Sequence, residues 1–460
     1  MNQTVLEPVA PASTEPGLTL ADPPPRTLGL LDQVALWGNL GMTLLGPVSA
    51  LFVLMPAGMP QLSLAAAFTA TVAGTLIGTV LLSLASFAGA RTGAPAMVLM
   101  RGLFGGRLSY LPTILNLVQC LGWAIFELAV ISAAAQRLLP WRAHWVYVVV
   151  AGAATTGMAL RPLGAVRLLR RYALVAIVLA VGYLMVQAAR HPLPSLTHGS
   201  WSGFWPAADV AIAVAVSWIP LAADYSRHAR SARSAFTGSL IGYAVTQIAC
   251  YSLGLLAFST LASGSGDPQG QLFGAFLAVP VGWLAFAILI ARELDESFTN
   301  VYSTVVSIQN LRPLTDRRVL AVAVGALTTL GALVLHIAAY QDFLYLLGSV
   351  FVPMFAVFTV RYFVLGRGGT WDTSPRATSR PVLLVPWLLG FAAYQLVNPA
   401  TVGGWHDFWI HARSWLGVTP PSWASASIVS FVVAAAATLL LAAVFPALGR
   451  RGLRESVEVA

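Results

Sequence analysis

The sequence contains no lysine, only two cysteines and few charged residues of any kind. Charged side chains make up 9% of the 460 residues, whereas a soluble domain carries roughly 25%. This shortage of charge excludes an ordinary soluble protein. Cys120 and Cys250 both fall inside apolar segments, without the spacing of a metal site, so we expect packing residues and neither a disulfide nor a metal centre.

Apolar residues are what the chain has in abundance: 57% of its residues are hydrophobic, and the mean hydropathy is +0.76. An α-helix needs about 20 mostly apolar residues to cross a membrane, and the alternating polarity of a transmembrane β-strand is absent. We therefore predict an all-α polytopic protein of the lipid bilayer with twelve transmembrane helices and no soluble catalytic domain. The predicted spans are 32–55, 63–88, 110–135, 144–160, 172–189, 207–224, 236–261, 273–304, 319–338, 342–364, 382–398 and 426–447.

The basic residues are 26 arginines, which contribute to a net charge of +9. Most of them lie in tails and loops on the side of the N-terminus, for example in 161–171 and 227–233. Because basic loops stay in the cytoplasm, we expect a plasma (inner) membrane protein with both termini cytoplasmic, and no nucleic-acid partner. Residues 1–30 lack the basic and apolar regions of a signal peptide and are expected to form a disordered cytoplasmic tail, with a second cytoplasmic tail at 449–460.

Two predicted spans contain helix-breaking residues. The first reads "LWGNLGMTLLGPVSALFVLMP", and the sixth, "AVAVSWIPLAADYSR", carries Pro220 just before Asp224. Transporters often pair such broken helices in inverted repeats, because the freed backbone groups must find partners in protein or in a water-lined cavity. The interval of five helices predicts five-helix repeats at 31–190 and 205–365, followed by two additional helices at 381–448. Glycine and proline are also common in membrane helices generally, which is the alternative explanation.

The third predicted span, "LNLVQCLGWAIFELAV", has polar side chains at intervals of four residues. Gln119, Trp123 and Glu127 therefore form one stripe along one helix face. A charge inside the membrane costs roughly 2.5–3.5 kcal/mol on insertion scales, which favours a functional role. An amide, an indole and a carboxylate together suit a flat heterocycle with hydrogen-bonding edges. Alternatively, Trp123 packs against a neighbour and Glu127 pairs with an arginine.

The stretch "ARELDESFTN", at 291–300, places four ionised side chains inside an otherwise apolar segment. Arg292 can pair with Asp295 and Glu296, three and four residues later. The following "VYSTVVSI" is apolar, so the cluster is expected in the interior of a helix and not at a solvated end. Asp295 shares a face with Thr299, which suits a cation or a proton, and Asn300 suits the edge of a heterocycle. The residues alone do not separate these roles.

These motifs resemble the nucleobase–cation symport family, the permeases for cytosine, purines, uracil, allantoin, hydantoin and thiamine precursors. The resemblance covers about residues 30–450 and rests on "GWAIFE", "SWIPLAADYSR", "DESFTNVYSTVVSIQN" and the "RTGAPAMVLMRGLFGG" segment, in this order. It implies a LeuT-like five-plus-five inverted repeat with two additional C-terminal helices. It also implies alternating access around a site in the middle of the membrane, and no cofactor.

The resemblance also assigns substrate-binding residues. The stacking tryptophan of the family falls on Trp123, and the asparagine that touches substrate falls on Asn300. The second stacking aromatic falls on Ala215, which is not aromatic. Trp218, one turn later, is expected to replace it, with Ser217 as a neighbouring hydrogen-bonding group.

The family's coupling ion is less clear from this sequence. In sodium-coupled members, two adjacent hydroxyl residues of span 8 hold the ion with carbonyls of span 1, here assigned to Gly41. The hydroxyl positions fall on Leu294 and Asp295, so one oxygen ligand is lost and a carboxylate is gained. Asp295, with Thr299 beside it, is expected to bind sodium or to carry a proton.

Glu127 stands where hydantoin-type members have an amide, and it informs the choice of substrate. A carboxylate accepts hydrogen bonds, and a protonated carboxyl both donates and accepts, so either suits an amino-substituted ring better than uracil. We predict a cation symporter of a hydroxymethylpyrimidine-type aminopyrimidine, a thiamine precursor. Cytosine or a purine is the alternative within the family. An intramembrane enzyme, a channel and an amino-acid transporter fit less well, and no obligate protein partner is evident.

Overall fold

The computed structural model describes residues 20, 22–56, 58–139, 143–168, 174–261, 268–334, 340–366 and 371–445. These residues form helices and no strand apart from two isolated β-bridges, and the predicted tails lie mostly or wholly outside them. The elements are α1 (Leu30–Leu40), α2 (Leu45–Leu54), α3 (Leu64–Thr92), α4 (Ala96–Phe104), α5 (Tyr110–Leu138), α6 (His144–Leu160), α7 (Pro162–Leu168), α8 (Leu174–Ala189), α9 (Phe204–Ser217), α10 (Ile219–Ser226), α11 (Ala232–Thr260), α12 (Pro268–Ala278), α13 (Gly282–Leu311), α14 (Arg317–Val334), α15 (Tyr340–Thr359), η2 (Val360–Leu365), η3 (Pro381–Leu383), α16 (Leu384–Val397), α17 (Trp405–Trp415) and α18 (Ala426–Val444).

Each predicted span coincides with a helix or with a pair of consecutive helices. Within the described residues, seven helices are long and apolar enough to cross a membrane, and the bent pair α1–α2 makes an eighth. Three shorter apolar helices and the charge-bearing α13 account for the other predicted spans. The all-α membrane architecture is therefore confirmed, while the count of twelve crossings stays a prediction.

The first span is sharply broken. α1 and α2 meet at an angle of 63°, with residues 41–44 between them. Gly41 lies so close to α11 that a Cβ at this position would approach the Thr246 hydroxyl oxygen to 2.2 Å. The sixth span is interrupted more mildly, since only Trp218 separates α9 from α10 and its backbone remains helical. Both expected breaks exist, but only the first exposes two helix ends to the interior.

The eighth predicted span, 273–304, is not one helix. α12 ends at Ala278, and α13 begins at Gly282 after Val281, whose φ of 55° is left-handed. Pro280 and Gly282 flank this residue, and both disfavour an uninterrupted helix. α13 therefore begins later than expected, and Arg292 lies well inside it, as predicted for the charged cluster.

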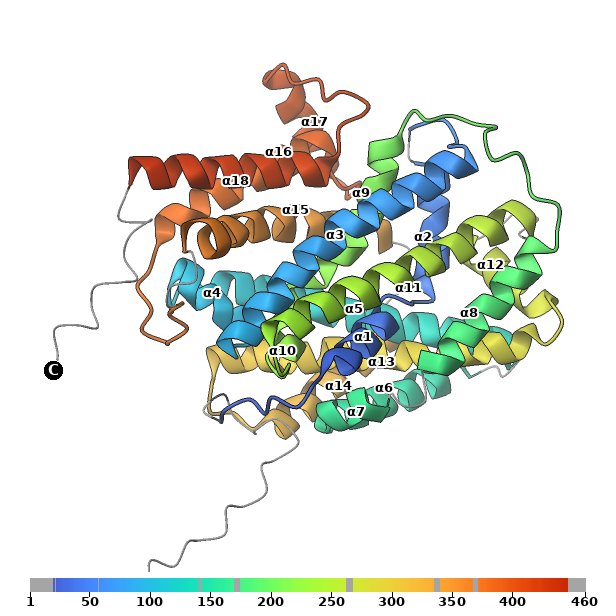
Figure 1. Cartoon of the computed structure of the whole chain (residues 1–460), viewed down its shortest axis with the longest axis horizontal. Coiled ribbons are helices and arrows are strands. Elements are labelled where there is room, and N and C mark those ends of the chain that lie inside the picture. The colour runs from blue at the N-terminus through green and yellow to red at the C-terminus, as the bar shows by residue number, and fades with distance from the viewer. Residues whose placement is uncertain are drawn as a thin grey trace, which may run out of the picture.

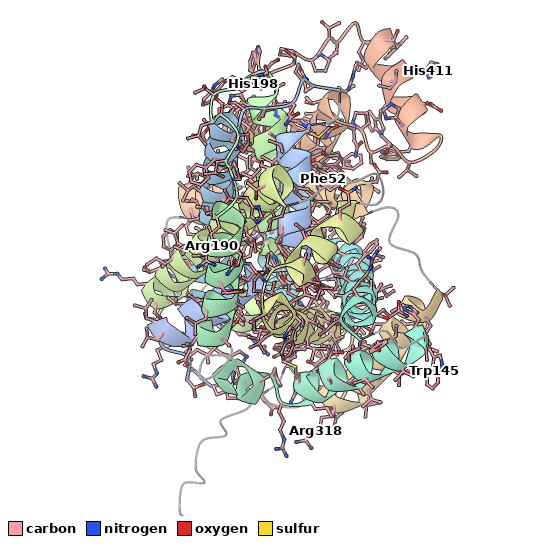
Figure 2. The ribbon with its side chains drawn as sticks, turned by 90° about the vertical axis from the view of Figure 1, so that its right-hand side faces the viewer. Phe52, Trp145, Arg190, His198, Arg318 and His411 are labelled. Carbon is pink, nitrogen blue, oxygen red and sulfur yellow. The ribbon has the colours of Figure 1, made fainter. Side chains whose placement is uncertain are left out.

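The helices form one tightly packed bundle (Figure 1). α13 packs along α5, α11 packs against α1 and α3, and α3 packs against α9. Small residues permit the last contact, because a Cβ at Gly74 would come within 2.3 Å of the Ala208 carbonyl oxygen. Figure 2 shows Phe52 of α2 near the middle of its view and Trp145 of α6 at the rim. Most residues of α1 and of α2 are buried, so both halves of the broken first span lie inside the bundle.

The arginine-bearing segments 22–29, 227–231 and 312–318 lie together at one end of the bundle, which we call the arginine-rich end. Residues 22–29, the N-terminal strap, lie across the ends of α3 and α10 there. The backbone of Leu28 bonds to His228 and Arg230, and Arg26 Nη1 donates to the Ala90 carbonyl at 2.7 Å. The opposite end carries the α2–α3 junction, where Leu62 forms a β-bridge with Ser200.

Candidate functional site

The candidate site lies between α5 and α13, which pack side by side in opposite directions. Two side-chain hydrogen bonds fix their register: Asn310 Nδ2 donates to Thr113 Oγ1 at 2.7 Å, and Asn116 Nδ2 donates to Ser307 Oγ at 2.8 Å. The two helices are therefore antiparallel: a step of three residues toward the C-terminus of α5 faces a step of three residues toward the N-terminus of α13. This register extends to the polar residues that the sequence analysis selected on both helices.

The same register places Trp123 level with Asn300 and Glu127 level with Glu296. It also brings three carboxyl groups together, because one oxygen from each of Glu127, Glu293 and Glu296 lies within 4.8 Å of the other two. All three side chains are buried. Such a cluster is stable only if protons or cations compensate the charge, since desolvation of an ionised carboxylate costs several kcal/mol (roughly, after relaxation).

The selected residues of α5 also reach α9 and α15. Gln119 Nε2 donates to the carbonyl of Ser217 at 2.9 Å, at the end of α9, and Trp218 follows directly. The Trp123 ring meets Phe343 edge-on, with the centroids 5.4 Å apart. The stripe on α5 is therefore joined to the sixth span at one level and to an aromatic of α15 at the next.

Several buried acceptor atoms along this interface have no hydrogen-bond partner among the described residues, including Glu296 Oε2 and Asn310 Oδ1 on α13. Three of them belong to predicted substrate-binding residues: Gln119 Oε1, Glu127 Oε2 and Asn300 Oδ1. The donor groups of the two amides are used: Gln119 donates to α9, and Asn300 Nδ2 donates to the Glu296 carbonyl at 3.3 Å. A buried acceptor without a partner is costly, which favours a ligand that donates hydrogen bonds.

Arg292 compensates part of the acidic charge. Its guanidinium forms ion pairs with Glu293 at 3.1 Å, Glu296 at 3.3 Å and Asp295 at 3.6 Å. The predicted pairs at three and four residues are thus confirmed. Its Nη2 also donates to the carbonyl of Asn39 in the last turn of α1.

Glu293 connects α13 to the other side of the α1–α2 break. Its carboxylate accepts from Thr43 Oγ1 at 2.8 Å and from the Leu44 backbone N–H at 2.9 Å. Sequence reasoning assigned no role to Glu293 or Thr43, because their contact joins segments about 250 residues apart. The adjacency of Arg292 and Glu293, opposite charges inside one membrane helix, was the available signal.

The residues assigned to cation coupling are not drawn together around one point. Thr299 Oγ1 donates to the backbone carbonyl of Asp295 at 2.7 Å, within its own helix. Gly41 has a packing role against α11. The side chain of Asp295 has Arg292 as its cationic partner, and Leu294 offers no oxygen ligand. This donor set does not fit the sodium site that the family resemblance implies.

Comparison with known proteins gives an independent result. A family model described as "Permease for cytosine/purines, uracil, thiamine, allantoin" matches residues 33–374. No curated protein sequence matches the chain.

Solved structures of transporters share the fold. Mhp1, a nucleobase-cation-symport-1 family transporter in a closed conformation with bromovinylhydantoin bound, is 17% identical, with a TM-score of 0.71 and coverage of 94% of this chain and 97% of Mhp1. A Na⁺-coupled sialic acid symporter in a substrate-bound outward-open state is 13% identical, with a TM-score of 0.60 and coverage of 93% and 92%. A manganese transporter of Eremococcus coleocola is 14% identical, with a TM-score of 0.55 and coverage of 94% and 98%. At these identities the likeness shows a LeuT-like fold and leaves the substrate open.

Proposed function

Because this chain belongs to the family of permeases for cytosine and purines, uracil, thiamine and allantoin, we propose that it is a symporter of an amino-substituted heterocycle. The family and the related structures are transporters, so the chain is a secondary transporter and not an enzyme. The proposed substrate is a hydroxymethylpyrimidine-type aminopyrimidine, a thiamine precursor. It moves by alternating access, together with a cation, across the inner membrane.

The unpartnered acceptors carry this proposal. Gln119, Glu127 and Asn300 each direct an unbonded oxygen within the α5–α13 interface. An aminopyrimidine carries an exocyclic NH₂ whose two hydrogens can donate to such oxygens. Uracil offers two carbonyl acceptors in the corresponding places and would leave protein acceptors unsatisfied. The chemistry therefore favours a ring with amino groups.

Aromatic side chains supply the flat surfaces. Trp123 lies level with Asn300, so a ring stacked on the indole would turn its edge toward the amide. Trp218 and Ser217, at the junction of α9 and α10, would line the opposite side. The site is thus proposed to lie where the third, sixth and eighth predicted spans meet.

Cytosine or a purine is the second candidate, favoured by the same three acceptors. Cytosine presents one NH₂ group beside a ring nitrogen, which Glu127 can match in the same way. Substrates within this group differ in size and in ring substituents. A measurement of transport separates them.

Uptake into proteoliposomes tests the function. Radiolabelled hydroxymethylpyrimidine is supplied with a sodium gradient or a proton gradient imposed separately, and with cytosine, adenine or uracil as competitor. We expect saturable, gradient-driven uptake that Glu127→Gln and Asp295→Asn abolish, while Asp407→Asn on the exposed α17 leaves it unchanged. Uptake of cytosine or a purine alone would transfer the function to the second candidate. Absence of any heterocycle uptake by folded protein would refute both.

A further inference from the structure

Arg292 places a buried positive charge at the break between α1 and α2. Its side chain is 1% exposed and lies beside the last turn of α1. The last carbonyls of such a helix end carry partial negative charge and are only partly satisfied by tight-turn bonds, such as that from the Met42 N–H to the Asn39 carbonyl at 3.1 Å. The Arg292 guanidinium donates to one of them, that of Asn39, while it pairs with Asp295. A positive charge, a helix-end carbonyl and an anionic side chain are thus already combined within the protein.

The neighbouring residue completes the arrangement with the opposite sign. α2 begins directly after Leu44, and the N–H groups of a helix start carry partial positive charge. Glu293 accepts from the Leu44 N–H, and its carboxylate is 3.1 Å from the Arg292 guanidinium. Consecutive residues of α13 therefore place a cation at the end of α1 and an anion at the start of α2. The Arg292–Glu293 ion pair therefore places a positive charge at the partially negative end of α1 and a negative charge at the partially positive start of α2.

We propose that the Arg292 guanidinium is the resident cation of the α1–α2 break, so that this chain transports its substrate without a sodium ion at that position. A sodium ion bound at the break would need carbonyl oxygens of the broken span and an oxygen ligand from α13. Arg292 already donates to the Asn39 carbonyl and neutralises the Asp295 carboxylate through an ion pair at 3.6 Å, although neither Asp295 oxygen accepts a hydrogen bond among the described residues. This inference rests on the proposed function, whose coupling ion it concerns, and it predicts uptake that does not require sodium.

Thermal unfolding of the purified full-length protein tests the inference without any knowledge of the substrate. A ligand that binds only the folded state raises its melting temperature. We expect no difference for the unaltered protein between sodium chloride and choline chloride at equal ionic strength. Arg292→Ser removes the guanidinium and opens the Asn39 carbonyl and Asp295 to an added ion. We expect sodium to raise its melting temperature by roughly 2 °C or more.

Control variants separate this effect from a general loss of a buried arginine. Arg317 is also buried and donates to the carbonyls of Ala159 and Leu160 at the arginine-rich end. Arg317→Ser should remain indifferent to sodium, and so should Arg292→Lys, which keeps a tethered cation. If Arg292→Ser does not fold, the double variant with Glu296→Gln leaves fewer uncompensated carboxylates and serves the same test.

Two results would overturn the inference. One is stabilisation of the unaltered protein by sodium, or substrate uptake by it that requires sodium. The other is a folded Arg292→Ser protein that does not respond to sodium. Neither result depends on which heterocycle is transported, so the proposed function and this inference can fail separately. If the protein transports no heterocycle but sodium stabilises Arg292→Ser, the proposed function fails and the inference about Arg292 stands.

Discussion

The position of Glu127 lets its carboxyl group interact both with a bound substrate and with the charged residues at the α1–α2 break. Across the interface it faces Glu293 and Glu296, while its Oε2 atom has no hydrogen-bond donor among the described residues. A carboxyl group in this position can accept from a substrate and can interact electrostatically with the charges at the α1–α2 break. The residue therefore lies between the proposed substrate site and the Arg292 ion pairs.

Although Glu127→Gln should abolish uptake, the variant should still bind heterocycles and show an altered preference among them. The amide replaces one acceptor oxygen with an NH₂ donor, which favours a ring carbonyl over a ring amino group. A hydrogen bond to a charged group contributes about 1.5–3 kcal/mol, so the preference for cytosine over uracil should fall by at least about tenfold. Competition of both compounds against labelled substrate binding measures this ratio. An unchanged ratio, as expected for the Asp407→Asn control, would remove Glu127 from the site.

Trp123→Ala tests the stacking surface. Stacking of a base on an aromatic side chain contributes about 1–3 kcal/mol, so the dissociation constant should rise roughly 5- to 150-fold. Trp123→Phe should retain most of the affinity, because Phe343 still packs on the ring edge. Trp145→Ala, at the rim of the bundle (Figure 2), is the matched control and should bind normally. Equal affinities for both alanine variants would argue against stacking.

At the scale of helices, the sequence predicted what depends on length and apolarity. All twelve predicted spans coincide with helices, because an apolar run of this length has few other stable forms. The α12–α13 boundary was missed because the apolar run continues through "VPVGW", although Pro280 and Gly282 were available signals for the turn at Val281. The Glu293–Thr43 contact was also missed, because it arises from tertiary packing that a periodic pattern within one helix does not contain.

The N-terminal strap is held by a histidine that is kept neutral. His228 is 1% exposed, and its Nδ1 lies 3.1 Å from the Pro25 carbonyl oxygen. Burial lowers its pKa well below the usual value, and the guanidinium of Arg227 adds to this effect. The charges of Arg26 and Arg317 act in the same direction. The neutral His228 thus lies close to three arginines where the N-terminal strap crosses the end of α10.

Docking of the strap should therefore weaken in acid. A released His228 takes up a proton below its usual pKa of about 6.5, whereas the docked residue resists protonation. The docked state is fully favoured above this pH and loses about 1.4 kcal/mol per unit as the pH falls below it. Hydrogen exchange at the Leu28 amide, corrected for its intrinsic pH dependence, should accelerate about tenfold per unit below pH 6. His228→Gln should remove this dependence, and constant protection in the unaltered protein would contradict the prediction.

At the scale of the whole molecule, charge separates the two ends of the bundle. α3 runs from the α2–α3 junction, beside Ser200, to the arginine-rich end, where Ala90 binds Arg26. The sequence analysis placed the arginines by counting loops, and the structure brings several of those loops together through contacts between distant segments. Which end faces the cytoplasm is a separate matter, because the arrangement of helices is the same in either orientation.

The predicted orientation rests on the positive-inside rule and can be measured in whole cells. Arg318 lies in the first turn of α14 at the arginine-rich end, and His198 precedes α9 at the opposite end (Figure 2). The native Cys120 and Cys250 are buried and give a low background for thiol reagents. A membrane-impermeant maleimide should label His198→Cys in intact cells but label Arg318→Cys only after permeabilisation. The reverse pattern would invert the predicted topology, and labelling of both sites in intact cells would show that the arginines do not impose a single orientation.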